Sequence, residues 1–468
     1  MSPTSSRDLI IATAVVIYVA ATAVLTVFLR SRTSKQFMVA GRALPAAVIG
    51  ILLMSEFIGA KSTVGTAQEA FEHGMAAGWS VLAASIGFLL LGLFFARQIH
   101  TSGQHTISGL VEQRFGSGAR TVVSVLMIYA LLLVNVGNYV SGAAVLTSAL
   151  HIDTSLSICV VAVCSGVYYI FGGLKGIAYV TVLHSLLKLL AIGVLVWVAV
   201  SLGADITPMM KTLPETYFTW DGQVGAPTIL AWVVGTVGTL FSTQFIVQAI
   251  AAARTPAAAR AAALIAALLC LPLGFALAFV GVAARYLYPQ QSSLYALPVF
   301  ISNMATPLAA LVTVSLVASV LVSVSTVALA ITSLVMRDFY VPWARPETEQ
   351  ELRATRWIAV VVGLVPLLCV IFTPHILALS FFTRALRLSI AMVALIGVYL
   401  PWLGSARAAV TALIASGVAT TAWYVLGDPL GVDNMYIAAM TPAAVLMFDK
   451  LFSGRGRPSS TPRPETSA

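Results

Sequence analysis

Apolar runs of about twenty residues recur along almost the whole chain and are separated by short polar segments. A run of that length crosses the hydrocarbon core of a bilayer, which is roughly 30 Å thick. The pattern predicts an all-α polytopic membrane protein whose single transmembrane domain covers residues 1–454. Thirteen spans are expected, with ends placed to within a few residues: Leu9–Leu29, Ala43–Ala70, Ala76–Ala96, Thr121–Leu150, Leu156–Phe171, Ile177–Leu202, Thr228–Ala252, Ala257–Leu287, Pro307–Phe339, Ile358–Phe372, Ile376–Leu400, Ala408–Leu426 and Met435–Leu451.

The composition agrees with a chain that has lipid as its solvent. Of the 468 residues, 59% are hydrophobic and 9% are charged, against roughly 45–50% and about 25% in a typical soluble domain. This balance excludes a soluble globule. The first apolar run is too long for a signal peptide and lacks a small-residue cleavage site. After Leu451 the chain is rich in Arg, Pro, Ser and Thr, and residues 455–468 are expected to be a disordered cytoplasmic tail.

Charge in the loops predicts the orientation of the chain. Loops after odd-numbered spans are basic and loops after even-numbered spans are acidic, so the positive-inside rule places the N-terminus outside and the C-terminus inside a plasma or inner membrane. Topology therefore explains the net charge of +9, and no nucleic-acid partner is expected. The basic residues are Arg30, Arg32, Lys35, Arg42, Arg97, Arg114, Arg120, Lys175, Arg254, Arg260, Lys450, Arg455 and Arg457, and the acidic ones are Glu69, Glu72, Asp205, Glu215, Asp221, Asp428 and Asp433.

Neither metal chemistry nor catalysis is indicated by the sequence. Cys159, Cys164, Cys270 and Cys369 lie inside apolar runs, with neither a CxxC pair nor a partner histidine. We interpret them as small core residues, so no disulfide framework and no metal site are expected. No HExxH, GxSxG or carboxylate cluster occurs, so no enzyme activity and no catalytic residue are expected.

Two spans carry glycines near their centres, where glycine weakens a helix by about 1 kcal/mol relative to alanine. The second span holds Gly59 and Gly65, and the seventh holds Gly235 and Gly238. An offset of five spans reverses orientation, so the pattern predicts two inverted five-helix repeats, over about residues 43–203 and 228–400. Each repeat would open with a discontinuous helix, and the binding site would lie at the midplane. Alternatively, the glycines serve close helix packing.

Charged residues inside the spans are the first candidates for function. A charge at bilayer depth costs at least ~2.5–3.5 kcal/mol on insertion scales, so it is seldom kept without a partner or a task. Glu56 and Lys61 flank Gly59 in the second span. They are expected to line the site, or alternatively to form a structural ion pair.

The sixth span carries Thr181, His184 and Lys188, spaced by three and four residues and therefore on one helical face. A polar stripe of this kind faces protein or water rather than lipid. Alternatively, the three residues serve packing, an interhelical hydrogen bond and a lysine that reaches water.

Two arginines, Arg384 and Arg387, lie inside the eleventh span. They are expected to line a cavity or to pair with Glu56. Together with Lys61 they favour an anionic or carboxylate-bearing substrate. Alternatively, this span is interrupted near Thr383 and the arginines stabilise the break.

Five segments, read in order, resemble the sodium:solute symporter family over roughly Phe37 to Leu400. They are Phe37-Met-Val-Ala-Gly41-Arg42; Glu112-Gln-Arg114-Phe115-Gly116; Gly172-Gly173-Leu174 followed by Thr181 and His184; Gln244-Phe-Ile-Val247-Gln248; and Val322-Ser323-Val-Ser325-Thr326 followed by Ser333 and Asp338-Phe-Tyr340. The resemblance implies a thirteen-span form of the leucine-transporter-like inverted-repeat fold. It also implies secondary active transport of a small polar solute, with sodium as the coupling ion.

The resemblance also implies where sodium would bind. In that family the ion lies between backbone carbonyls of the broken second span, here near Ile49 and Leu52, and a hydroxyl pair in the ninth span, here Val322 and Ser323. An acidic residue of the sixth span lies nearby, and Thr181 stands at its position. A hard cation prefers several oxygens and negative charge, and this site lacks one hydroxyl and the carboxylate.

Two coupling mechanisms therefore remain open. Sodium is the family's expectation, and the alternative is a proton-coupled or cation-independent carrier that uses Lys188 and His184. In related leucine-transporter-like carriers a fixed positive charge stands in for sodium, and burial makes such a lysine titratable.

By position, the substrate-binding candidates are Glu56, Lys61, Ser62, Thr63, Gln244 and Arg384, and the ion-site or coupling candidates are Ile49, Leu52, Thr181, His184, Lys188 and Ser323. The polar ones among them also suit helix capping or interhelical hydrogen bonding. A channel or a receptor working through a partner are the competing classes, although no selectivity-filter signature occurs. The expected partners are a small-molecule solute and the lipid bilayer, with no obligatory protein partner and no cofactor beyond a coupling Na+ or H+.

Overall fold

The computed structural model describes residues 6–150, 152–370, 376–427, 429 and 432–453. The expected disordered tail, 455–468, lies outside the described residues, as does the end of the span predicted at Ile358–Phe372. The longer helices, together with the half-helix α12, are α1 (Ser6–Phe28), α3 (Ala46–Phe57), α4 (Ala60–His73), α5 (Trp79–Leu90), α7 (Ile107–Leu150), α8 (Thr154–Val167), α9 (Gly173–Ser201), α11 (Ala226–Ser242), α12 (Gln244–Ala251), α13 (Pro256–Leu287), α15 (Thr306–Leu334), α17 (Thr348–Val370), α18 (Ile376–Tyr399), α19 (Ala406–Val425) and α20 (Asn434–Ser453).

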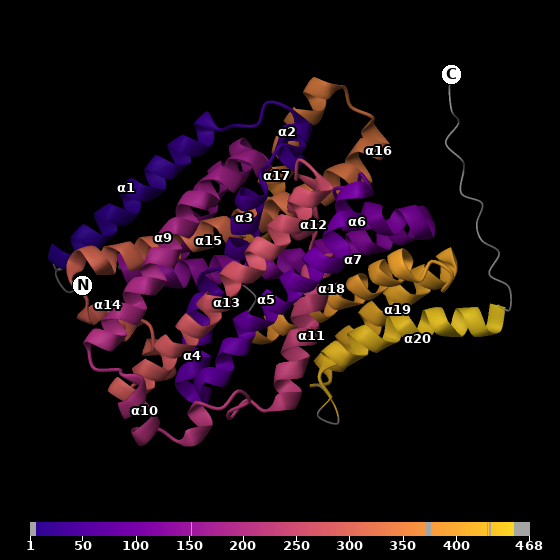
Figure 1. Ribbon diagram of the computed structural model, residues 1–468. Coiled ribbons are helices and arrows are strands. Elements are labelled where there is room, and N and C mark those ends of the chain that lie inside the picture. The colour runs from indigo at the N-terminus through magenta and orange to yellow at the C-terminus, as the bar shows by residue number, and fades with distance from the viewer. Residues whose placement is uncertain (1–5, 151, 371–375, 428, 430–431, 454–468) are drawn as a thin grey trace.

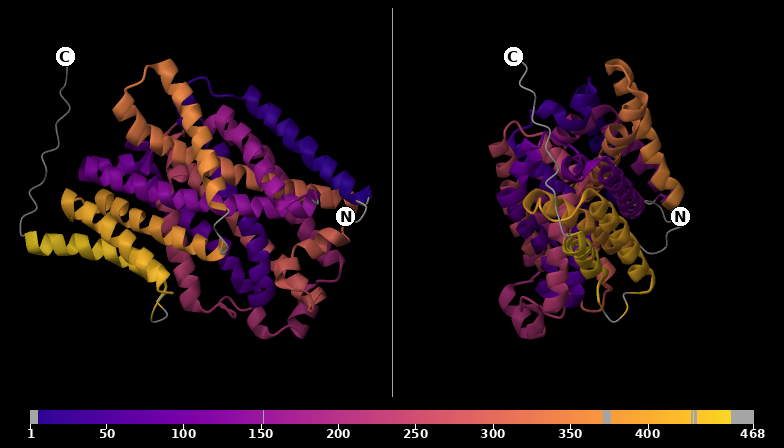
Figure 2. Two further views of the ribbon diagram at one scale, coloured as in Figure 1. Left: turned by 180° about the vertical axis from the view of Figure 1, so that it is seen from behind. Right: turned by 90° about the vertical axis from the view of Figure 1, so that its right-hand side faces the viewer.

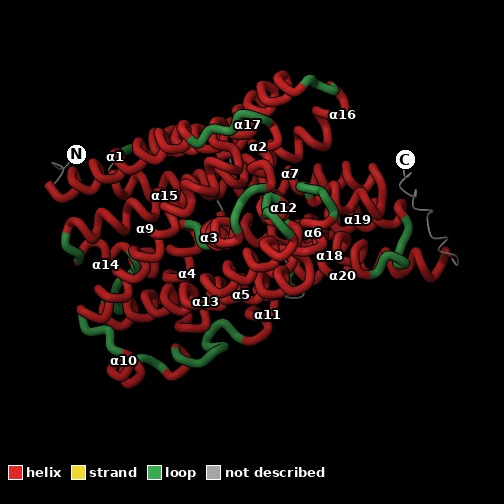
Figure 3. Tube along the Cα trace, turned by 45° about the horizontal axis from the view of Figure 1, so that its top comes forward, coloured by secondary structure: helices red, strands yellow, loops and turns green. Residues whose placement is uncertain are grey.

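Short helical turns connect or extend these helices, as Figure 3 shows for the described chain. They are α2 (Ser34–Val39), η1 (Ala40–Arg42), η2 (Gly74–Gly78), η3 (Leu91–Phe95), α6 (Ala96–Thr101), η4 (Tyr168–Gly172), α10 (Ile206–Thr212), η5 (Glu215–Tyr217), η6 (Ser293–Tyr295), α14 (Pro298–Asn303), η7 (Val335–Tyr340) and α16 (Val341–Ala344). Within the described ranges, the β-type pairing found is one parallel bridge between Leu44 and Ala253.

The helices form one bundle with two central members (Figures 1 and 2). Helix α15 packs against α1, α7, α9 and α17, and α13 packs against α3, α4 and α5. Helices α19 and α20 pack together along one side, where α20 also contacts α18. In the most apolar 18-residue stretch of α15 and its extension, 94% is buried, against 22% in that of α1. Helix α15 therefore lies at the centre of the bundle and α1 at its rim.

Polar and apolar side chains are distributed in the bundle as in a membrane protein. Large apolar side chains of α1 point outward, with Ile17 64% and Phe28 83% exposed. Polar and charged side chains lie inside instead, including His184 and Lys188, which are completely or almost completely buried. Exposed apolar surface is favourable where lipid replaces water, and buried polar groups need partners there.

Nine helical segments of the described chain are long and apolar enough to cross a membrane. The number rises to ten if the bent pair α11 and α12 is counted as one span. Two of these segments, Ala60–Thr101 and Thr154–Ser201, contain 42 and 48 residues. Each is about twice the length that one crossing needs. The all-helical membrane architecture thus agrees with the sequence, whereas the count of thirteen stays a prediction.

The second span is interrupted between α3 and α4. Ile58 leaves the helical conformation (φ −90°, ψ 69°), and Gly59 is extended (φ −80°, ψ −178°) before α4 begins. A Cβ atom on Gly59 would lie 2.6 Å from Oγ of Ser323 on α15. A side chain at this position would therefore have to displace the hydroxyl of Ser323. The other glycine singled out in this span, Gly65, lies within α4.

The seventh span is interrupted at Thr243, between α11 and α12, and the two helix axes differ by 51°. The expectation that Gly235 and Gly238 break this span is wrong, because both lie inside α11. Their Cβ positions would fall 2.2 Å from Sδ of Met435 and 2.1 Å from Cδ1 of Leu388. These glycines serve close packing against α20 and α18.

Helix α13 makes its closest approach to α4 at Gly281, and we expect Gly281→Ala to destabilise the bundle. The new Cβ would lie 2.3 Å from the backbone oxygen of Ala67 and 2.6 Å from Cβ of Ala70. Overpacking of this kind costs about 1–3 kcal/mol, which a melting experiment in detergent would register as a lower Tm. Gly193→Ala is the matched control, because nothing lies within 4 Å of its Cβ position. Equal melting temperatures for both variants would contradict the close contact.

Candidate functional site

A cavity of about 240 Å³ lies between the two interrupted spans. Its walls include the end of α3, the start of α4, helix α11 with the break at Thr243, and helices α15 and α18. Its charged lining consists of two carboxylates and three cations. The residues that line it and carry the argument below are Glu56, Lys61, Ser62, Glu69, Asn138, Trp232, Thr243, Ser323, Thr383, Arg384 and Arg387.

Glu56 sits in the last turn of α3, directly before the break. Its carboxylate accepts a hydrogen bond from Oγ1 of Thr326 on α15. It also interacts electrostatically with Arg387 on α18 and Lys188 on α9. The carboxylate of Glu56 thus interacts with residues of three other helices, α15, α18 and α9, which are distant from it in the sequence.

Arg387 connects the cavity to the second break. Its Nε donates to the carbonyl of Thr383 at 3.0 Å, and its Nη1 donates to Oγ1 of Thr243 at 3.1 Å. Oγ of Ser242 donates in turn to the carbonyl of Arg387 at 2.7 Å. Arg387 therefore holds α18 against the α11–α12 interruption, while the partly exposed Arg384 lines the cavity.

Lys188 reaches the first break from the middle of α9. Its Nζ donates to Oγ of Ser55 at 2.9 Å, to the carbonyl of Ser55 at 3.2 Å and to the carbonyl of Ile58. The side chain is 1% exposed. The ammonium thus binds the carbonyls that the end of α3 leaves without helical partners.

The carbonyls that Lys188 binds lie further along the chain than the pair expected at the ion site. Ile49 and Leu52 lie inside the continuous helix α3, both fully buried, more than one turn before the break. The carbonyls that Lys188 binds at the break belong to Ser55 and Ile58. The expectation that carbonyls near Ile49 and Leu52 hold the coupling ion stays a prediction.

His184 lies one turn from Lys188 in a buried aromatic cluster. Its Nδ1 is hydrogen-bonded to the hydroxyl of Tyr18 on α1 at 2.7 Å. Its ring centroid lies 5.5 Å from that of Tyr18 and 5.9 Å from that of Tyr168. Nε2 of His184 and Oγ1 of Thr181 are buried without a hydrogen-bond partner among the described residues. The expected polar face of α9 thus lies inside the protein.

Four of the six substrate-binding candidates line the cavity, and the other two lie outside it. Glu56, Lys61, Ser62 and Arg384 line the cavity, as does Ser323 from the ion-site candidates. Thr63 does not: it is 4% exposed and donates to the carbonyl of Gly59 at 3.0 Å. Its hydroxyl is bonded back to the backbone within the first turn of α4.

Gln244 is also placed outside the cavity. Its Oε1 accepts from the backbone N–H of Ile107 at 3.0 Å, and its Nε2 donates to the carbonyl of His105 at 3.0 Å. This amide clasps the link between α6 and α7 to the start of α12. The expectation that Gln244 faces the substrate is corrected, since both polar atoms serve the backbone of that link.

Sequence reasoning missed several lining residues. Asn138 projects from α7 and donates to the carbonyl of Ser323 at 3.3 Å, and Trp232 and Thr243 come from the seventh span. Asn138 is a polar residue inside an apolar run, and this pattern could have identified it as a candidate. Tryptophan and threonine are common in membrane helices, so Trp232 and Thr243 gave no signal.

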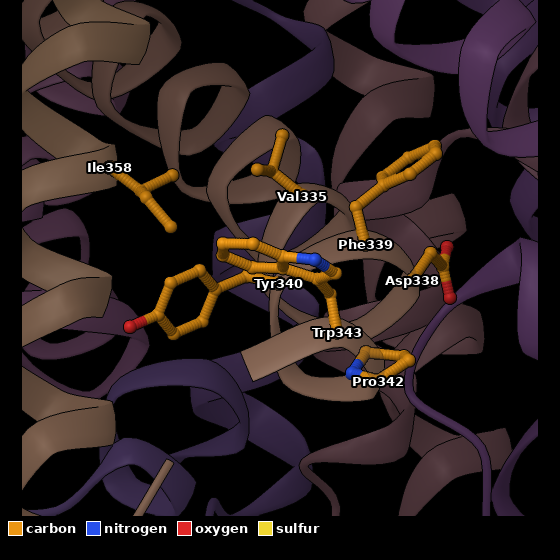
Figure 4. A pocket seen from close by; sticks show the side chains of 7 residues that line it. All are labelled: Val335, Asp338, Phe339, Tyr340, Pro342, Trp343 and Ile358. Atoms are coloured by element: carbon orange, nitrogen blue, oxygen red, sulfur yellow. The ribbon is translucent and has the colours of Figure 1, made fainter. Parts of the chain in front are cut away.

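A separate hollow of about 610 Å³ lies between η7, α16 and α17 (Figure 4). Its lining is mostly apolar and includes Phe339, Trp343 and Ile358. The carboxylate of Asp338 points away from Ile358 in Figure 4 and accepts from Ser108 and Ser124. This hollow carries no polar group that converges on a ligand, so it is not the candidate site.

A cavity with charged groups in its lining, between two interrupted helices of an otherwise apolar bundle, is the arrangement of secondary transporters. The structure is similar to that of a Na+-coupled sialic acid symporter in a substrate-bound outward-open state, with a TM-score of 0.82, 17% identity and coverage of 95% of this chain and 98% of that one.

The model of the sodium:solute symporter family matches residues 37–415. The chain therefore belongs to the sodium:solute symporter family, and it is a membrane transporter rather than an enzyme. The sodium/glucose cotransporter of Vibrio parahaemolyticus is 27% identical over 155 residues, which cover 33% of this chain and 28% of that protein. The symporter YwcA of Bacillus subtilis is 23% identical over 380 residues, or 73% of this chain and 71% of that protein.

The link that Gln244 clasps contains His105, whose environment predicts a dependence of stability on pH. Desolvation by burial, with Arg337 and Arg42 nearby, lowers the pKa of His105 to about 4. In the unfolded chain its pKa is near 6.5. The stability contributed by neutral His105 is thus complete above pH 6.5 and is lost as the pH falls from 6.5 towards 4.

We expect His105→Gln to reduce the fall in Tm between pH 7 and pH 5, by an amount corresponding to about 1–2 kcal/mol. His73→Gln is the control, since the side chain of His73 is 42% exposed. Parallel pH profiles for wild type and His105→Gln would show that the link does not exclude the charged imidazole.

Proposed function

We propose that this transporter carries a small, carboxylate-bearing organic solute and that the ammonium of Lys188 takes the place of the coupling cation. The observation that supports this most directly is the contact of Nζ of Lys188 with Oγ of Ser55 and with the carbonyls of Ser55 and Ile58. Transport is then coupled to protons or independent of cations.

The argument for this coupling is that the ammonium occupies the break next to the expected ion site. The family resemblance places sodium near the carbonyls of Ile49 and Leu52, and Lys188 donates to the carbonyls of Ser55 and Ile58 on the same interrupted span. A sodium ion would be repelled by this ammonium, and it would find a neutral Thr181 where the resemblance expects an acid. Proton release from Lys188, with His184 one turn away, would free the carbonyls and change the charge of the site.

Sodium coupling is the second candidate. It is favoured by the family and by Ser323, whose hydroxyl faces Gly59 at the break and lines the cavity. In that case Lys188 would hold the break in one conformation and leave it in another. The two candidates differ in what drives uptake, so one experiment separates them.

The carboxylate preference rests on the charge of the cavity. Lys61, Arg384 and Arg387 oppose Glu56 and Glu69 in the lining, and Glu56 is engaged by Thr326. A substrate carboxylate would complete the charge balance at Arg384 and Lys61, where charge-assisted hydrogen bonds are strong. A volume of about 240 Å³ lies below the usual range for drug-sized ligands, about 300–1,000 Å³.

The proposed architecture has thirteen spans, of which spans two to six and seven to eleven form inverted repeats over about residues 43–203 and 228–400. The interruptions at Gly59 and Thr243 support this, since they fall in spans that are five apart. If each of the two double-length segments crosses twice, the number rises from ten to twelve, and α17 would supply the thirteenth crossing. The basic loops support an outside N-terminus and a cytoplasmic C-terminus.

Uptake by the purified protein in liposomes tests the coupling. We expect a pooled panel of small metabolites to enter under a proton gradient or without any gradient, and not to require sodium. Lys188→Met should weaken the pH dependence of uptake, because the side chain that binds Ser55 and Ile58 would no longer titrate, while Glu56 would remain as a titratable neighbour. Lys175→Met is the matched control, on the same helix and outside the cavity.

The opposite pattern would overturn the proposal. If sodium removal abolishes uptake and Lys188→Met leaves both its rate and its pH dependence unchanged, the ammonium has no part in coupling. Ser323 and the carbonyls of the break would then suffice for sodium.

Competition for uptake tests the substrate class. We expect Arg384→Gln to raise the half-saturating concentration of a carboxylate substrate about 10- to 100-fold, since a hydrogen bond to a charged group is worth about 1.5–3 kcal/mol. Uncharged analogues of the same size should change much less. Arg407→Gln, at the exposed start of α19, is the control. Equal effects on charged and uncharged solutes would assign Arg384 to structure.

A further inference from the structure

We propose that a second site, at the membrane surface of α17, binds the headgroup of an anionic phospholipid. It is a hollow of about 650 Å³ between the link that joins α1 to α2, the turn η4 and the first half of α17. Helix α17 contacts α2 and η4 here, and Figure 3 shows it running beside the α1–α2 link. The site is separate from the transport cavity and shares no lining residue with it.

Three arginines converge on the hollow: Arg32 from the link, and Arg353 and Arg356 from α17. Glu349 is the acidic residue in the lining, so the net charge of the wall is +2. An excess of guanidinium groups over carboxylates favours an anion, and guanidinium geometry suits the oxygens of a phosphate.

Arg356 is already oriented towards the hollow. Its Nη2 donates to the carbonyl of Ser31 at 3.0 Å, and its guanidinium lies 6.0 Å from the centre of the Phe171 ring. Nε of the same side chain is buried in the protein, so the Ser31 carbonyl and the Phe171 ring hold this guanidinium in place beside the hollow.

The position along α17 identifies the anion as part of a lipid. The helix is polar from Thr348 to Arg356 and apolar from Trp357 onward, so Trp357 marks the level at which water meets hydrocarbon. Trp357 is 67% exposed, and Trp343, on the neighbouring α16 in Figure 4, is 84% exposed. Exposed tryptophans of this kind belong to the interfacial belt of a membrane protein.

An apolar track continues from the arginines into the membrane. Arg353 and Arg356 are followed on the same face of α17 by Trp357, Val361, Leu364 and Leu368, and these four are 67%, 57%, 54% and 67% exposed. A charged head above an exposed apolar stripe matches a phospholipid, with its phosphate on the arginines and an acyl chain along the stripe. Basic pockets between helices at a membrane surface bind anionic headgroups in this way.

Lipid binding by the intact, detergent-purified chain tests the proposal. Native mass spectrometry would follow titration with phosphatidylglycerol, phosphatidylcholine or inorganic phosphate. We expect phosphatidylglycerol to bind more tightly than phosphatidylcholine. The double variant Arg32→Gln/Arg353→Gln should weaken phosphatidylglycerol binding about 25-fold, since each basic residue near an anionic surface contributes roughly a factor of 5. Both arginines are exposed, so folding should be preserved, which an unchanged Tm would verify.

Lys35→Gln/Arg345→Gln is the matched control, because it removes the same charge from exposed positions outside the hollow. It should keep the affinity of the wild type. Equal phosphatidylglycerol affinity in both double variants, or no preference over phosphatidylcholine, would overturn the proposal. Inorganic phosphate that displaces the lipid through Arg32 and Arg353 would assign the arginines to a soluble anion and also overturn it.

Discussion

A helix that breaks inside a membrane leaves backbone carbonyls that water cannot reach, and the rest of this structure depends on how they are satisfied. At the first break the ammonium of Lys188 binds the carbonyls of Ser55 and Ile58. At the second break Nη1 of Arg387 donates to the hydroxyl of Thr243, and the hydroxyl of Ser242 donates to the carbonyl of Arg387. Both breaks are thus stabilised by groups from other helices, and the cavity between them exists because those helices are in place.

The charges at the two breaks are linked through Glu56. This carboxylate interacts with both Lys188 and Arg387, the cations that serve the first and the second break. A change in charge at any one of the three groups alters the electrostatic energy of the other two, and this effect is strong in surroundings of low dielectric constant. In the proposed mechanism, solute and proton would therefore need no direct contact to influence each other.

The sequence predicted the chemistry of the cavity better than its exact positions. Buried charges are so costly in a membrane that Glu56, Lys61 and Arg384 were visible as candidates, and all three line the cavity. The end of α3 lies where Gly59 approaches Ser323, a contact between distant parts of the chain. The sequence pattern therefore could not decide between Gly59 and Gly65 as the site of the break. The bend at Thr243 is likewise bonded to Arg387 from a distant helix, whereas the glycines of this span lie inside α11.

The clasp that Gln244 forms has a consequence for motion. Because its amide is bonded to both Ile107 and His105, the half-helix α12 and the α6–α7 link behave as one mechanical piece. Any rearrangement that opens a passage between them must first break two hydrogen bonds, each worth about 1 kcal/mol net. A bound solute can drive such an opening only through the difference in its affinity for the two conformations. The two hydrogen bonds of Gln244 thus oppose a spontaneous opening between α12 and the α6–α7 link, through which solute could leak.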